Sequence, residues 1–243
     1  MNSAAAPRLP VTRDVLADTW DLFQRSWLTC LPMALVGVAA SSVPGTEAAA
    51  DATVVHDRQW WALYVVSVLL TLTTYGAVSI HQWRRVTATE TAPGLLEALR
   101  LSVRRLPAAG ATAILVTLAT LLGLAVLVLP GLAAGVWLSL AYMAALNERL
   151  PPLAACRRSV SLVRGRFWLV AKVLLVAFMA VLVFVILAPI LFNIVVSVGG
   201  TTLLATAPGL WFSRLMFSLL LALPVVYVSA LLVSLYRRLA AAD

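Results

Sequence analysis

The sequence predicts an all-α, polytopic membrane protein with six transmembrane helices, arranged as three repeats of an interfacial amphipathic helix plus a two-span hairpin. Three observations support this prediction. First, 62% of the 243 residues are hydrophobic and only 12% are charged, a balance that a water-soluble domain could not bury. Second, apolar runs of roughly 20 residues recur, the length with which a helix crosses a bilayer. Third, charged amphipathic segments precede alternate runs.

The apolar runs define the spans. In order, they cover residues 28–43, 60–80, 106–147, 167–198 and 210–235. The run at residues 106–147 is too long for one helix, and Pro130-Gly131 in its middle predicts a break. We therefore count this run as a tight hairpin of two spans, which gives six spans in total.

Basic residues are concentrated on one side of these spans. Of the 18 Lys and Arg residues, 16 lie at the two ends of the chain and at residues 81–105 and 147–172. Only Arg58 and Arg214 lie on the other side. Cytoplasmic loops carry an excess of Lys and Arg, so this asymmetry places both termini in the cytoplasm. The predicted location is the bacterial inner membrane, since the preference for Arg over Lys is typical of bacteria with GC-rich genomes.

A short amphipathic segment precedes the first, third and fifth spans. In the third segment, Pro151-Pro152 predicts the start of a helix whose apolar stripe is Leu153, Cys156, Val160, Val163 and Phe167. We expect such helices to lie among the lipid headgroups. A helix packed on its protein neighbours is the alternative. The repeat units cover about residues 12–80, 95–147 and 152–238 of a single membrane domain, residues 1–243.

Two sets of side chains are candidates for binding. The first set is basic and would contact lipid phosphates, because long basic side chains extend to the headgroup level. It consists of Arg84, Arg85, Arg100, Arg104, Arg105, Arg157, Arg158, Arg164, Arg166 and Lys172. The second set is polar and lies inside the spans, where it would line a cavity or serve helix packing. It consists of Thr74, Thr117, Thr120 and Asn193.

The sequence contains no recognisable catalytic centre. No nucleophile and base occur at a common depth of the spans, so an intramembrane hydrolase or transferase is the least favoured class. The outer loop contains Glu47, Asp51, His56 and Asp57, but one histidine with flexible carboxylates makes a poor metal site. We therefore expect a non-enzymatic protein with no cofactor and no metal. Charges spread between apolar runs also favour lipid over nucleic acid as the partner.

Two segments resemble a known bacterial family. They are LPGLAAGVWLSLAYMAALNERL, residues 129–150, and LPPLAACRRSVSLVRGRFWLVAKVLLV, residues 150–176. Both are similar to the membrane domain of bacterial glycerophosphoryl diester phosphodiesterases and of stand-alone YciC-like inner-membrane proteins. The similarity extends from Leu95 to Pro189. It implies a stand-alone member without the phosphodiesterase domain, and it supplies a fold without an active site.

Two functions follow from these observations. The first is a non-enzymatic inner-membrane protein that binds anionic lipid and acts in envelope organisation or as a membrane partner, either of another protein or of a second copy. The alternative is a small permease or translocator of an apolar or amphiphilic solute, with the polar set lining its path.

Overall fold

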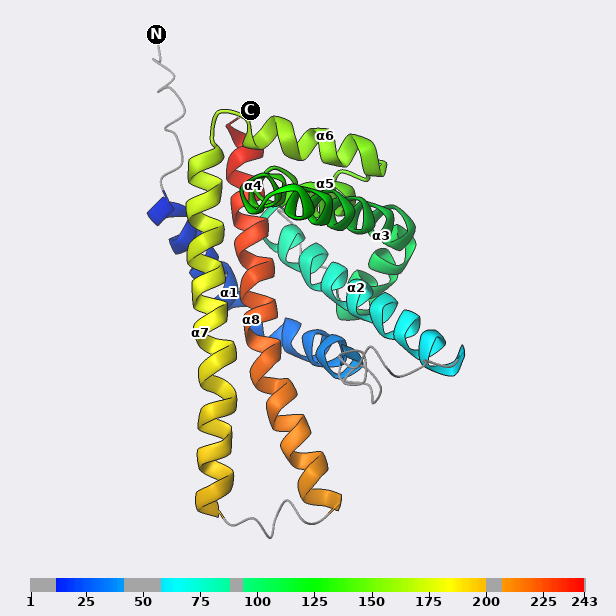
Figure 1. The fold of residues 1–243 in the computed structure, drawn as a ribbon, viewed down its shortest axis with the longest axis vertical. Helices are drawn as coiled ribbons and strands as arrows, with labels where there is room; N and C mark the ends of the chain where they lie inside the picture. Colours follow the sequence, from blue (N-terminus) through cyan, green and yellow to red (C-terminus); the bar gives the residue numbers. More distant parts are fainter. Residues whose placement is uncertain (1–11, 42–57, 88–93, 200–206, 243) are drawn as a thin grey trace.

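The computed structural model describes residues 12–41, 58–87, 94–199 and 207–242. Within these ranges the chain is almost entirely helical and contains no strand. The helices are α1 (Thr12–Ser41), α2 (Arg58–Thr87), α3 (Leu95–Val126), α4 (Val128–Leu138), α5 (Ala141–Asn147), α6 (Pro152–Val163), α7 (Phe167–Gly199) and α8 (Ala207–Ala241). In Figure 1, α7 and α8 run along the long axis, and their lower ends extend beyond the other helices.

Six stretches of the described chain are long and apolar enough to cross a membrane. They are Thr12–Ala39, Arg58–Thr87, Leu95–Val126, Val128–Asn147, Phe167–Leu187 and Leu220–Ala241. The all-α class is therefore confirmed, and so is the number of long apolar helices. These helices indicate a multi-pass membrane protein.

Helix α8 lies at the centre of the packing. Its C-terminal half contributes the fully buried Leu235, Tyr236 and Leu239 to a core shared with α1, α5, α6 and α7. One face of its middle part, at Ala222 and Val226, joins a second cluster formed with α1, α2 and α3. The repeat of buried residues at three- and four-residue spacing gives α8 a continuous apolar face.

The first two amphipathic segments do not turn before their spans. Helices α1 and α3 each continue through the predicted boundary, and α3 does so across Pro107. Only the third segment is separate: α6 ends at Val163, and Gly165, with φ 80°, turns the chain toward α7. Glycine adopts this left-handed conformation readily, and no described residue of α1 or α3 does so. The prediction of a separate amphipathic helix is therefore correct only for the third copy.

The hairpin between α3 and α4 bends three residues before the predicted position. The bend is at Leu127, whose backbone is extended, so Pro130 lies in the first turn of α4, where a missing N–H is tolerated. Gly131 serves a different purpose, because the two helices approach closely there. A Cβ atom added to Gly123 would lie 2.8 Å from the Cα atom of Gly131.

Helix α6 buries part of its apolar surface against protein. Ala155, Leu162 and Val163 are fully buried in the main core, and α6 contacts α5, α3, α4 and α8. Leu153, the first residue of the predicted apolar stripe, is instead 65% exposed. The structure therefore favours the alternative interpretation of α6 as a helix packed on its neighbours.

Candidate functional site

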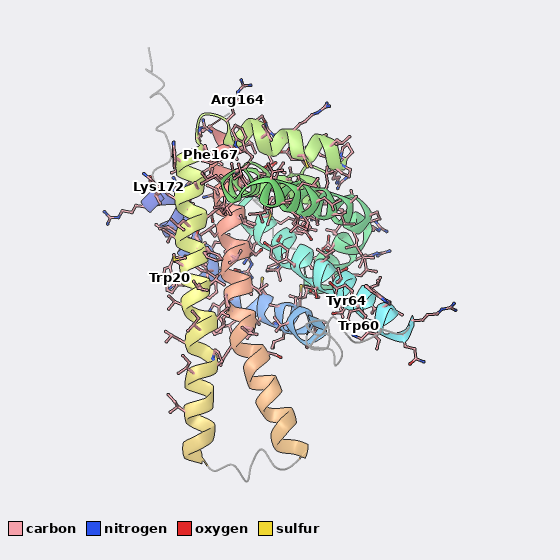
Figure 2. All side chains as sticks on the ribbon, viewed as in Figure 1. Trp20, Trp60, Tyr64, Arg164, Phe167 and Lys172 are labelled. Atoms are coloured by element: carbon pink, nitrogen blue, oxygen red, sulfur yellow. The ribbon has the colours of Figure 1, made fainter. Side chains whose placement is uncertain are left out.

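The charged segments of the described chain meet at one end, which we call the arginine-rich end and define as residues 12–25, 81–87, 94–105, 146–166 and 237–242. Asp18 on α1 accepts hydrogen bonds from Arg237 Nη2 at 2.9 Å and from Arg238 Nε at 2.7 Å on α8. Arg166, before α7, donates to the carbonyl oxygen of Ala242 at 2.8 Å. In Figure 2, the labelled Arg164 and Phe167 lie at this end, near the C-terminus of α8 marked in Figure 1.

Half of the predicted headgroup residues are engaged with protein. Arg85 donates to the carbonyl of Arg25, Arg105 to that of Leu146, and Arg166 to those of Leu239 and Ala242. Leu146, Leu239 and Ala242 lie at the C-terminal ends of α5 and α8, where carbonyls lack partners within the helix and a guanidinium stabilises the end. Arg84 pairs with Glu97 at 3.8 Å, and Arg158 with Glu148 at 3.5 Å. These five residues hold the helices together.

The other half project from the surface. These exposed residues are Arg100, Arg104, Arg157, Arg164 and Lys172. Arg100 and Arg104 lie one turn apart on α3, on the same segment as the exposed apolar side chains of Leu96 and Val103. Exposed cations next to exposed apolar side chains form the kind of surface that contacts both phosphates and acyl chains.

A pocket of about 370 Å³ at this end is lined by three arginines, which we call the arginine pocket. Its lining residues are Leu101, Arg104, Arg105, Ala108, Ala145 and Arg149. No carboxylate belongs to this lining. Arg149 has φ 57°, a left-handed conformation that is uncommon for residues other than glycine. Sequence reasoning placed Arg149 on the basic side but not among the candidates, since nothing in the pattern brings it next to α3.

An apolar cavity of about 470 Å³ lies between α1, α2, α7 and α8. Thr74 lines it, and its hydroxyl donates to the carbonyl of Leu70 at 2.9 Å. Thr117 is exposed on α3, and Thr120 donates to its own helix at Val116. Neither belongs to the cavity lining, and the side chain of Asn193 lies outside the described ones. The structure therefore does not bring Thr117 and Thr120 together with Thr74.

A buried polar layer lies one helical turn from this cavity, and sequence reasoning missed it. Gln82 on α2 is fully buried and donates through Nε2 to Ser26 Oγ and to the carbonyl of Val226, both at 3.2 Å. Ser79 and Ser229 share a hydrogen bond of 3.0 Å. These contacts join α1, α2 and α8. The sequence signal was ambiguous, because polar residues beside Arg84 are expected at a membrane interface.

Groups suited to metal or nucleophilic chemistry are scarce in the part of the chain that the structure describes. No three His, Cys, Asp or Glu side chains gather within it. The loop residues Glu47, Asp51, His56 and Asp57 lie outside the described ranges. Burial raises the pKa of the Cys156 thiol, which lowers its thiolate fraction and hence its reactivity.

Comparisons with known proteins give no match: no family model, curated protein or solved structure is similar to this chain. The resemblance to the phosphodiesterase-associated membrane domain therefore stays a prediction. A proposal about function therefore has to be argued from the geometry of the arginine-rich end and of the apolar cavity.

Proposed function

We propose that this protein is a non-enzymatic, multi-pass protein of the bacterial inner membrane that binds anionic phospholipid at its arginine-rich end. The exposed arginines of α3 and α6, together with the arginine pocket, carry the proposal. Its cellular role would be in envelope organisation, either directly or as a membrane partner of another protein.

This function is supported by the difference between arginines that contact protein and arginines that are exposed. Arginines that only stabilise the fold have a carboxylate or a carbonyl to contact, as Arg158 and Arg166 do. Arg100, Arg104, Arg157 and Arg164 are exposed instead. Each basic residue close to an anionic membrane surface contributes about 1 kcal/mol of attraction, so these four arginines would favour anionic over neutral phospholipid around this end.

The test replaces these four exposed arginines by glutamine and counts bound lipids by native mass spectrometry of the full chain released from mild detergent. We expect the wild-type protein to retain phosphatidylglycerol and the glutamine variant to lose it. The matched control carries lysine at the same four positions, which keeps the charge, and it should retain the lipid. Equal retention by the glutamine variant and the control would contradict the proposal.

A permease or translocator of an apolar or amphiphilic solute is the second candidate, and the apolar cavity supports it. The cavity lies among four of the long helices, and Gln82, four residues after the lining residue Val78, has a buried Oε1 atom that accepts no hydrogen bond from the described residues. An amphiphile with a hydroxyl group would match an apolar cavity beside such an acceptor.

Filling the cavity tests this second function. Val181 lines it from α7, so Val181→Trp should obstruct it and slow the flux of a hydroxylated apolar dye into proteoliposomes by about tenfold or more. Val183, two residues along and 54% exposed, faces away, so Val183→Trp is the control. Equal flux through both variants would rule out this cavity as a path.

A further inference from the structure

We infer that the arginine pocket is a selective site for a phosphomonoester group carried by a membrane lipid, with Arg104, Arg105 and Arg149 as its ligands. This inference rests on the proposed function and specifies it. It assigns to one site a preference for phosphomonoester over phosphodiester lipids, which scattered surface arginines would not have.

The first argument is electrostatic. Three arginines and no acidic residue belong to the described lining of the pocket, although acidic residues lie close by in the sequence. Glu148 is the residue before Arg149, but its two oxygens contact Tyr236 and Arg158. Glu97, on the same helix as Arg104, pairs with Arg84. The nearby carboxylates thus point elsewhere, and the positive charge of the pocket is left for an anion from outside.

The second argument concerns preorganisation. Arg105 donates through one Nη atom to the carbonyl of Leu146, which fixes the plane of its guanidinium and leaves its other N–H groups available. Arg149 follows Glu148, the C-cap of α5, and has φ 57°, the left-handed conformation with which many helices end. Its place in the pocket wall is therefore set by the end of α5. A guanidinium group whose orientation is fixed can donate two parallel hydrogen bonds to two oxygens of one phosphate.

The third argument identifies the chemical class. A phosphomonoester carries a charge of about −1.5 to −2 at pH 7, because its second pKa is near 6, whereas a phosphodiester carries only one negative charge. Three cations around one group therefore favour the monoester. Leu101, Ala108 and Ala145 form the apolar part of the wall, and Ala108 lies one turn beyond Arg104 along the candidate span of α3. An apolar wall beside the charges favours a lipid over a soluble phosphate.

The experiment compares three probes on the full-length protein in mild detergent: dioctanoyl phosphatidic acid, dioctanoyl phosphatidylglycerol and glycerol 3-phosphate. Calorimetric titration at fixed salt should show phosphatidic acid binding about tenfold more tightly than either of the others. The pocket variant Arg104→Gln/Arg149→Gln should bind the two lipids equally. The control variant Arg157→Gln/Arg164→Gln loses the same charge outside the pocket and should keep the preference.

A second variant separates binding from folding. Arg149→Gly removes the cation but suits the left-handed backbone, so its melting temperature should equal or exceed that of the wild type while its preference for phosphatidic acid is lost. Lowering the pH from 7.5 to 5 should also reduce the preference of the wild type, because the monoester takes up a proton whereas arginine stays charged.

Each contrary result has a distinct meaning. If the pocket and control variants lose the preference equally, or if it persists at pH 5, the pocket is not the site, although anionic lipid binding stands. If glycerol 3-phosphate binds as tightly as phosphatidic acid, the ligand is a soluble phosphomonoester and the assignment to a lipid is wrong. If neither lipid binds the wild-type protein, the proposed function fails as well.

Discussion

At residues 95–106 the chain runs without interruption into the rest of α3, whereas at residues 152–163 it forms the separate helix α6 and turns at Gly165. Both segments combine apolar residues with arginines at helical spacing. Both segments contain buried and exposed apolar residues: Ala155 of α6 and Ala98 of α3 are fully buried, whereas Leu153 of α6 is 65% exposed and Leu96 of α3 is 83% exposed. Amphipathic spacing thus predicts a helix with an apolar side, but it does not predict whether lipid or protein covers that side.

The arginines of both segments are likewise divided between exposed residues and residues that contact protein. In α6, Arg158 pairs with Glu148, and Arg166, just after the helix, holds the C-terminal end of α8. In α3, Arg100 and Arg104 are exposed, and Arg104 lines the arginine pocket. Under the proposed function, α3 would supply Arg104 and Arg105 to the arginine pocket, whereas Arg158 of α6 joins α6 to the end of α5 through Glu148. Four substitutions test this difference.

The largest effect is expected at the hairpin that follows α3. A Cβ atom on Gly131 would lie 2.6 Å from the backbone nitrogen of Leu124, so Gly131→Ala should destabilise the protein by about 1–3 kcal/mol through overpacking. Thermal unfolding in mild detergent measures the change. Gly110, in α3, has no atom within 4 Å of such a Cβ, and Gly110→Ala should leave stability equal or higher by about 0.5–1 kcal/mol. Equal behaviour of the two variants would mean that the hairpin is not closely packed.

An effect of similar size is expected where α6 contacts the break between α4 and α5. The buried hydroxyl of Ser159 donates to the carbonyl of Trp137 at 2.7 Å and accepts from the N–H of Leu140 at 3.2 Å. Ser159→Ala leaves both backbone groups without a partner and should cost about 1–3 kcal/mol. Ser161 is exposed and bonds only within α6, to Arg158, so Ser161→Ala is the control. No loss at Ser159 would favour a helix that lies on lipid.

The turn between α6 and α7 should be less sensitive. Gly165 has φ 80°, but a Cβ atom there would meet nothing within 4 Å. Gly165→Ala therefore introduces backbone strain without a clash, for which we expect about 1–2 kcal/mol and a lower unfolding temperature. Gly94 is equally open and has φ −57°, so Gly94→Ala should have no such effect. A tolerated alanine at residue 165 would show that this turn does not depend on glycine.

The parts of this fold that the sequence could predict are those that depend on local composition. Apolar length identified the long helices, and the positions of the arginines identified the segments that form the arginine-rich end. The bend at Leu127 was missed because proline suits the first turn of a helix as well as a break. The contacts of Ser159, the buried position of Gln82 and the place of Arg149 beside Arg104 depend on tertiary packing between distant segments. No spacing within one helix records such contacts, so a single sequence could not reveal the arginine pocket.

The smallest change in stability is expected for two neighbouring arginines of α6, which lose the same charge when replaced by glutamine. Arg158 is partly buried and pairs with Glu148, so Arg158→Gln should cost roughly 0.5–1 kcal/mol. Arg157 is exposed, so Arg157→Gln should change stability by less than about 0.5 kcal/mol. Retention of phosphatidylglycerol should follow the opposite order, because only Arg157 is available to a headgroup. If Arg158→Gln reduced lipid retention more than Arg157→Gln, the ion pair with Glu148 would open in the membrane and α6 would resemble α3 after all.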